Sequence, residues 1–204
     1  MDRNSLVFAD VDLTISLLKQ LRIDAPKSNS YPDSLKEFYY REIWESTLGT
    51  VENDFREGRI LNQIFIKPAE REKSFTGLVL DSQQSFYFVG NTSRRQKVHC
   101  SEVVRWLSEY RIYVVNSEIR SIDFYAGDSQ IKVNENEIKR AIKILDGAKE
   151  SYAGYAIDFG VLSTGETALV EMNDGFSIGA YKNVCAKDYT DMIFARWAEL
   201  LEKL

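Results

Sequence analysis

The spacing of apolar residues along the chain predicts helices near both ends and in the second half. Residues 15–21 and about 34–48 carry apolar side chains at spacings of three and four, which is typical of one buried helix face. A third amphipathic stretch covers about 135–149, and a fourth begins at Tyr189. We therefore expect four helices.

Between these stretches the pattern changes to short runs of β-branched and aromatic residues, which favour strands. The runs are 63–67, 76–80, 85–89, 98–104, 110–115 and 118–125. Asn116 and Ser117 predict a tight turn between the last two runs, with Arg111 and Tyr113 on one face of the sheet. Together the helices and mostly antiparallel strands indicate an α+β fold with sheets at its centre.

A hairpin over residues 155–173 carries the strongest chemical signal. With Thr164 and Gly165 at the centre of its turn, Asp158 lies directly opposite Glu171, and Asn173 shares their face. Opposed carboxylates repel each other, so a cation, a proton, or a Lys or Arg must neutralise them. Two carboxylates and an amide suit Mg²⁺. A solvated acidic face is the alternative, which the apolar residues on both sides of Asp158 disfavour.

Composition and charge narrow the class of protein. The 204 residues are 44% hydrophobic and 12% aromatic, which indicates a globular chain. A net charge of −5 argues against a sequence-independent nucleic-acid binder. Cys100 and Cys185 cannot form a disulfide framework, and neither a signal peptide nor a membrane span is visible. We expect a cytoplasmic protein with no membrane partner, and with Cys100 in its core.

Several familiar motifs can be set aside. Asp158-Phe159-Gly160 matches the metal motif of protein kinases, but no His-Arg-Asp loop and no G-x-G-x-x-G precede it. P-loop and dinucleotide fingerprints do not occur. One histidine and two distant cysteines are too few ligands for zinc.

Four segments, in order, resemble the ATP-grasp superfamily. Segment 64–68 resembles the strand whose lysine reaches the ATP phosphates, and segment 73–77 resembles the loop that covers them. Segment 101–114 resembles the adenine hinge and the following strand. Asp158, followed thirteen positions later by Glu171-Met172-Asn173 and a glycine turn, resembles the metal-binding signature. The match is similar to a compact bacterial and viral clade marked by conserved arginines and a lysine.

This resemblance implies an ATP-grasp fold of two α+β lobes, with mostly antiparallel sheets, that clamp ATP. It places a small lobe at about 61–104 and a large lobe at about 105–204, after a reduced helical region over 1–60. It also implies roles for individual residues. The ATP contacts are Lys67, Lys73, Glu102, Val104, Glu109 and Arg111; the catalytic residues are Arg111 and Lys67; the metal ligands are Asp158, Glu171 and Asn173.

The implied activity is that of an ATP-dependent ligase with Mg²⁺. It would join a small-molecule or peptide carboxylate to an amine or thiol through an acyl phosphate, releasing ADP and phosphate. An ATP-binding module or pseudoenzyme that acts in a complex without turnover is the alternative.

The sequence departs from the family pattern in two places. The covering loop has one glycine instead of several, and the usual N-terminal domain is missing or shrunk. We therefore expect a second subunit or a partner protein to complete the acceptor pocket. We also expect the fold to survive removal of either Asp158 or Glu171, because this relieves repulsion.

Overall fold

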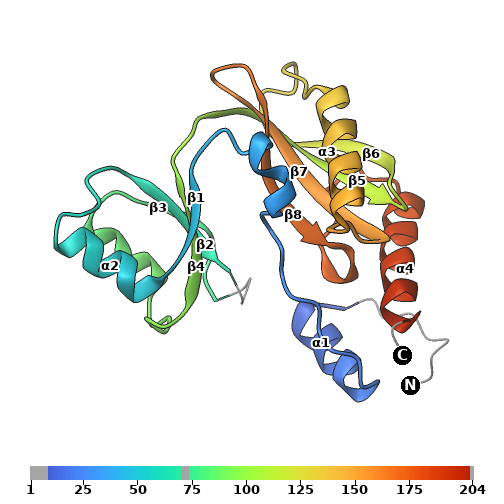
Figure 1. The fold of residues 1–204 in the computed structure, drawn as a ribbon, viewed down its shortest axis with the longest axis horizontal. Helices are drawn as coiled ribbons and strands as arrows, with labels where there is room; N and C mark the ends of the chain where they lie inside the picture. The colour runs from blue at the N-terminus through green and yellow to red at the C-terminus, as the bar shows by residue number, and fades with distance from the viewer. Residues whose placement is uncertain (1–8, 70–73, 203–204) are drawn as a thin grey trace. The chain divides into compact units, whose positions relative to one another are not determined.

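The computed structural model describes residues 9–69 and 74–202, which form two units (Figure 1). The large unit contains the chain up to Tyr40 and from Trp106 onward, and the small unit is Arg41–Arg105. The small unit thus begins at Arg41, earlier than the boundary expected at residue 61. The reason is that β1 (Ile43–Thr47) pairs with β4 (Lys97–Glu102).

The small unit is built on a four-stranded antiparallel sheet in the order β1-β4-β2-β3. Strand β2 is Ile64–Pro68 and β3 is Leu78–Leu80. Helix α2 (Leu48–Arg56) and the 3₁₀ helix η2 (Gln83–Val89) cover one face. Their shared core includes Cys100, 1% exposed as expected from the sequence, where burial raises the thiol's pKa to about 12.

The helix predicted over 34–48 is wrong. The chain forms a 3₁₀ helix, η1 (Asp33–Phe38), then leaves helical geometry at Tyr40, whose φ is 49°, and continues as β1. Leu35 and Phe38 are fully buried, because a spacing of three also aligns side chains on a 3₁₀ helix. The spacing therefore identified buried residues but not the type of element.

The strand predicted over 85–89 is also wrong, since these residues belong to η2. Phe86 and Val89 are buried at a spacing of three. Ser85 Oγ donates a hydrogen bond of 2.5 Å to Asp81 Oδ1 ahead of the turn. This local side-chain bonding favours a turn over a strand ladder.

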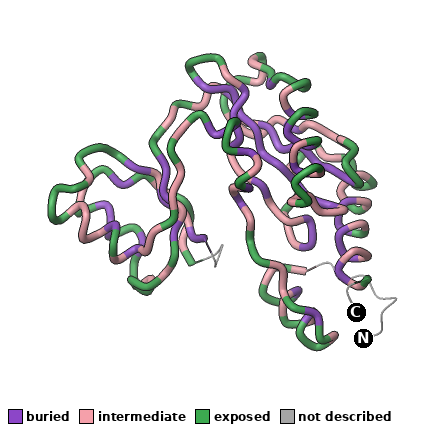
Figure 2. The backbone as a smooth tube through the Cα atoms, in the orientation of Figure 1, coloured by how far each residue is buried: buried purple, intermediate pink, exposed green. Residues whose placement is uncertain are grey.

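The large unit contains a second four-stranded antiparallel sheet, in the order β6-β5-β7-β8. Its strands are β5 (Trp106–Val115), β6 (Glu118–Gly127), β7 (Gly154–Leu162) and β8 (Thr167–Asp174). The long buried runs of β5 and β7 form its centre (Figure 2). The two antiparallel sheets with their helices confirm the expected α+β class.

Helices lie on both faces of this sheet (Figure 1). Helix α3 (Glu135–Ala148) packs with η1 on the face that carries Phe159, and α4 (Ala186–Glu202) packs on the face that carries Tyr113 and Ala156. Helix α1 (Val11–Gln20) joins a cluster that includes Trp197 of α4. None of the described helices is long and apolar enough to cross a membrane.

Turns and bulges set the register of the large sheet. Asn116 and Ser117 have φ values of 48° and 66°, so the predicted tight turn is confirmed as a two-residue turn of the left-handed kind. Further along β6 the pairing with β5 shifts by one residue at Arg120. A similar shift occurs in β8 between the partners of Phe159 and Asp158.

Candidate active site

A row of four charged residues crosses the large sheet on one face. Asp123 (β6) is paired with Arg111 (β5), Arg111 with Asp158 (β7), and Asp158 with Glu171 (β8). Directly opposed residues project to the same side of a sheet, and neighbouring strands lie about 4.8 Å apart. The predicted opposition of Asp158 and Glu171 is therefore confirmed, with Arg111 beside them.

Arg111 and Asp158 form a two-pronged ion pair in the interior. Arg111 Nε donates to Asp158 Oδ1 at 2.8 Å, and Nη2 donates to Oδ2 at 2.7 Å. The two residues are 8% and 2% exposed. Burial raises the pKa of Asp158 to about 6, although the guanidinium beside it acts in the opposite direction.

This pair answers how the opposed carboxylates are neutralised: an arginine does it. Removing Asp158 would leave the buried Arg111 guanidinium without its carboxylate, which destabilises a fold. The structure thus changes the expectation that the fold is indifferent to Asp158. For Glu171, which is only half-buried, that expectation stays a prediction.

Asn173 lies next to Glu171 on the same face of β8. Its Nδ2 donates to Glu171 Oε1 at 3.0 Å. The bond uses the amide nitrogen, so the carbonyl oxygen is the atom of Asn173 that a metal would take. Asp158, with two lone pairs on each oxygen, can accept from Arg111 and still face a cation.

These residues fit Mg²⁺ better than a metal held by protein alone. Within residues 9–69 and 74–202, no three His, Cys, Asp or Glu side chains gather as a metal site. Magnesium is usually held by one or two carboxylates, with phosphate and water oxygens completing its octahedron. Asp158, Glu171 and Asn173 therefore suit a Mg²⁺ ion that arrives with ATP.

The segment after β8 holds the other side of Arg111. Arg111 Nη1 donates to the carbonyl of Gly179 at 3.3 Å, and its guanidinium carbon lies 4.5 Å from the ring centre of Tyr181. The Tyr181 ring stacks on Tyr125, with centroids 4.5 Å apart and an interplanar angle of 10°. Contacts to both a strand and a loop leave Arg111 with little rotational freedom.

Glu109, the expected ribose contact, lies on the same strand face as Arg111, two residues away. Its Oε2 accepts a hydrogen bond of 3.0 Å from Tyr125 OH. Burial is the main cause that raises the pKa of Tyr125, so this hydroxyl stays protonated and keeps donating. Tyr125 thereby links Glu109 to the stack over Arg111.

The remaining expected ATP residues belong to the small unit, except that Lys73 lies outside the described residues. Lys67 on β2 is paired with His99 on β4. The Glu102 carboxylate accepts a 2.8 Å hydrogen bond from the backbone N–H of Glu42, and Val104 follows β4 half-buried. A Cβ atom on Gly77 would lie 2.7 Å from the Phe65 ring, so glycine lets this segment approach β2 closely.

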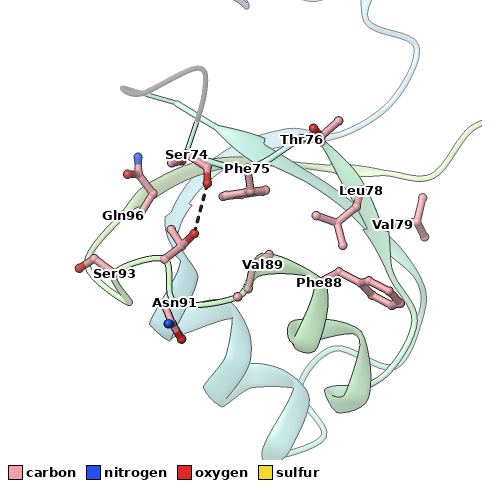
Figure 3. Close-up of a pocket in the computed structure, with 13 residues that line it drawn as sticks. Ser74, Phe75, Thr76, Leu78, Val79, Phe88, Val89, Asn91, Ser93 and Gln96 are labelled. Carbon is pink, nitrogen blue, oxygen red and sulfur yellow. Dashed lines mark hydrogen bonds between the residues drawn. The ribbon is translucent and has the colours of Figure 1, made fainter.

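The small unit also contains an open cavity of about 930 Å³ (Figure 3). Residues 74–79 line one side, and residues 88–93 with Gln96 line the other. Thr92 Oγ1 donates to the Ser74 carbonyl at 3.4 Å across it. The described part of the expected covering loop therefore lines this cavity.

Sequence reasoning missed a second buried ion pair next to the metal residues. Arg196 of α4, 1% exposed, donates to both oxygens of Asp174 at 2.7 and 2.6 Å, directly after Asn173. It also donates to Glu199 at 2.7 Å. An arginine at the buried spacing of Met192, Ile193 and Trp197 was the available signal.

Comparisons with known proteins agree with this geometry. A family model described as an ATP-grasp domain, family 2 of the clade named for two arginines and a lysine, matches residues 38–192. The search of curated proteins found no match.

Among solved structures, the chain is similar to D-alanine–D-alanine ligases. For the Bacillus anthracis enzyme the TM-score is 0.54 at 12% identity, covering 95% of this chain and 68% of that one. For the Helicobacter pylori enzyme it is 0.53 at 16%, covering 96% and 66%. N5-carboxyaminoimidazole ribonucleotide synthetase, in its ADP complex, gives 0.56 at 11%, covering 81% and 50%. At these identities the likeness concerns the fold, and the chain spans about two thirds of the length of the first two.

Proposed function

The chain belongs to the ATP-grasp family, in family 2 of the clade named for two arginines and a lysine, and from this membership we propose that it is an ATP-dependent ligase. It joins a carboxylate to an amine or thiol through an acyl phosphate and releases ADP and phosphate. The substrates are small molecules or peptides.

One observation carries the proposal: the buried Arg111 lies in register between the acidic pair and the edge strand. A fixed guanidinium beside two carboxylates can stabilise the charge of a transferring phosphoryl group, because charge-assisted hydrogen bonds are strongest where water is excluded. A solvated acidic hairpin would not require such an arginine.

Each residue has an assigned task in this proposal. Asp158, Glu171 and Asn173 would hold Mg²⁺, which shields the negative charge of the β- and γ-phosphates when bound. Lys67 contacts the phosphates, and Arg111 orients the acyl phosphate for attack by the amine. The protein contributes mainly positioning and charge stabilisation.

In the same proposal, further residues hold the nucleotide. Glu109 takes the ribose, with its carboxylate oriented by the Tyr125 hydroxyl. Glu102 and Val104 lie at the adenine hinge, and Lys73 joins Lys67 at the phosphates.

Product analysis tests the proposal. The full chain is incubated with Mg²⁺-ATP and pools of carboxylic acids and amines, and the nucleotides are separated by chromatography. ADP and phosphate are expected, together with a hydroxamate when hydroxylamine replaces the amine. AMP and pyrophosphate would refute the acyl phosphate route and the roles of Lys67 and Arg111. ATP binding without turnover under any pool would favour the ATP-binding module instead.

A further inference from the structure

Asp123 is the member of the charged row that the proposed function does not use. It is 7% exposed, and its Oδ2 has no hydrogen-bond partner among the residues that the structure describes. Of the five buried side-chain atoms in this condition, it is the only carboxylate oxygen. A buried carboxylate oxygen without a donor is costly, so its retention points to a donor that comes from outside the chain.

Two further polar groups lie beside Asp123. The hydroxyl of Ser121, two residues earlier on the same strand face, is also buried and without a well-formed hydrogen bond among the described residues. Burial raises the pKa of Asp123; the nearby Ser121 hydroxyl acts in the opposite direction, and the charge of Asp188, in the first turn of α4, adds to the rise. Asp188 is half-buried and marks the side from which a ligand would enter.

The nearby cations have carboxylate partners elsewhere. Lys187 pairs with Asp191, Arg120 with Glu118, and Arg111 with Asp158. No ion pair among the described residues includes Asp123 or Asp188. The two carboxylates therefore form a negative site that lacks a positive group.

An ammonium group fits this site better than a metal ion. It carries three donors, and the site offers two carboxylates and a hydroxyl. A metal would need a larger set of oxygen ligands. The position also suits an amine substrate: Asp123 lies one strand from Arg111 and two strands from Asp158, which corresponds to about 5 and 10 Å.

We propose that Asp123, with Asp188 and Ser121, binds the ammonium group of the amine substrate, and that Asp123 accepts its first proton. This rests on the proposed ligase function. The neutral amine then forms the C–N bond at the acyl carbon while the C–O bond to phosphate breaks. The leaving phosphate takes the second nitrogen-bound proton, and Asp123 returns the first to water. An amine, rather than a thiol, is the acceptor class.

Ligand-detected NMR on the full chain, with Mg²⁺ and a non-hydrolysable ATP analogue, tests the proposal. Glycinamide is the probe, and N-acetylglycinamide is the matched compound without an ammonium group. We expect glycinamide to bind and its acetylated form not to bind. Asp123→Asn and Asp188→Asn should each weaken glycinamide about ten- to hundred-fold. Glu118→Gln makes the same charge change on the same strand and should change nothing.

Calorimetry of ATP analogue binding separates the two proposals. If the analogue binds but glycinamide fails to bind, or binds equally to the Asp123→Asn and Asp188→Asn variants, the ammonium site is overturned. Displacement of glycinamide by Mg²⁺ without nucleotide would also overturn it in favour of a metal site. If the analogue does not bind while glycinamide binds through Asp123, the ligase function fails and the ammonium site stands.

Discussion

Replacement of Arg111 by methionine probes the charged row most directly. Methionine keeps much of the volume of the side chain but removes the cation, so Asp158 stays buried without its partner. Two charge-assisted bonds and the bond to the Gly179 carbonyl are lost together. Breaking a buried ion pair in this way costs about 3–5 kcal/mol of unfolding free energy. For a chain of this size that lowers Tm by about 6–20 °C.

The loss should depend on pH in a defined direction. Burial raises the pKa of Asp158 from 3.8 to about 6, and without the guanidinium this pKa should rise further. A folded-state pKa above the unfolded value favours the folded protein at low pH. That contribution is lost as pH rises through the folded pKa. Arg111→Met should therefore destabilise the protein more at pH 8 than at pH 5.

Hydrogen exchange of β5 and β7 peptides in a urea series measures this loss in the large unit, since a chain of two units need not unfold in one step. The double variant Arg111→Met with Asp158→Asn carries no buried charge here and should regain most of the stability at pH 8. An equal loss at both pH values, with no gain from the second substitution, would refute the reasoning.

Three further changes have clear expectations. Glu171→Gln should weaken Mg²⁺-dependent ATP binding by about tenfold or more with little change in Tm, because the residue is half-buried at a sheet edge; calorimetry and a melting curve measure both. Gly154→Ala should lower unfolding free energy by about 2 kcal/mol or more in urea titrations, since the new Cβ would lie 2.0 Å from the Met192 carbonyl. Asp174→Leu should lower it by about 3–5 kcal/mol, because Arg196 loses its bidentate partner, and Glu199→Leu should cost less.

The sequence was sufficient where periodicity and turn chemistry acted locally. The tight turn at Asn116 and Ser117 and the opposition of Asp158 and Glu171 both followed from short-range rules. The second succeeded partly by compensation. Pairing near the turn is one residue off the expected register, with Leu162 and Glu166 flanking the loop, and the bulge in β8 restores it at Asp158.

The sequence was insufficient where an irregularity changes which residues meet. A regular hairpin around Asn116 and Ser117 would pair Arg111 with Ile122, and only the extra residue at Arg120 brings Asp123 opposite Arg111. No propensity rule locates such a bulge. The contacts of Arg111 with Gly179 and Tyr181 depend on tertiary placement of a loop, which local pattern does not encode.

The division of the chain has a consequence for how it folds. The small unit is an insertion within the large one, and the pairing of Ile43 with Ser101 brings its two ends together. Once this unit has formed, the large unit has a short connection to close instead of a long one, which lowers the entropic cost by about 2 kcal/mol. Residues 41–105 should therefore fold when expressed alone, whereas the large unit should tolerate their replacement by a short linker.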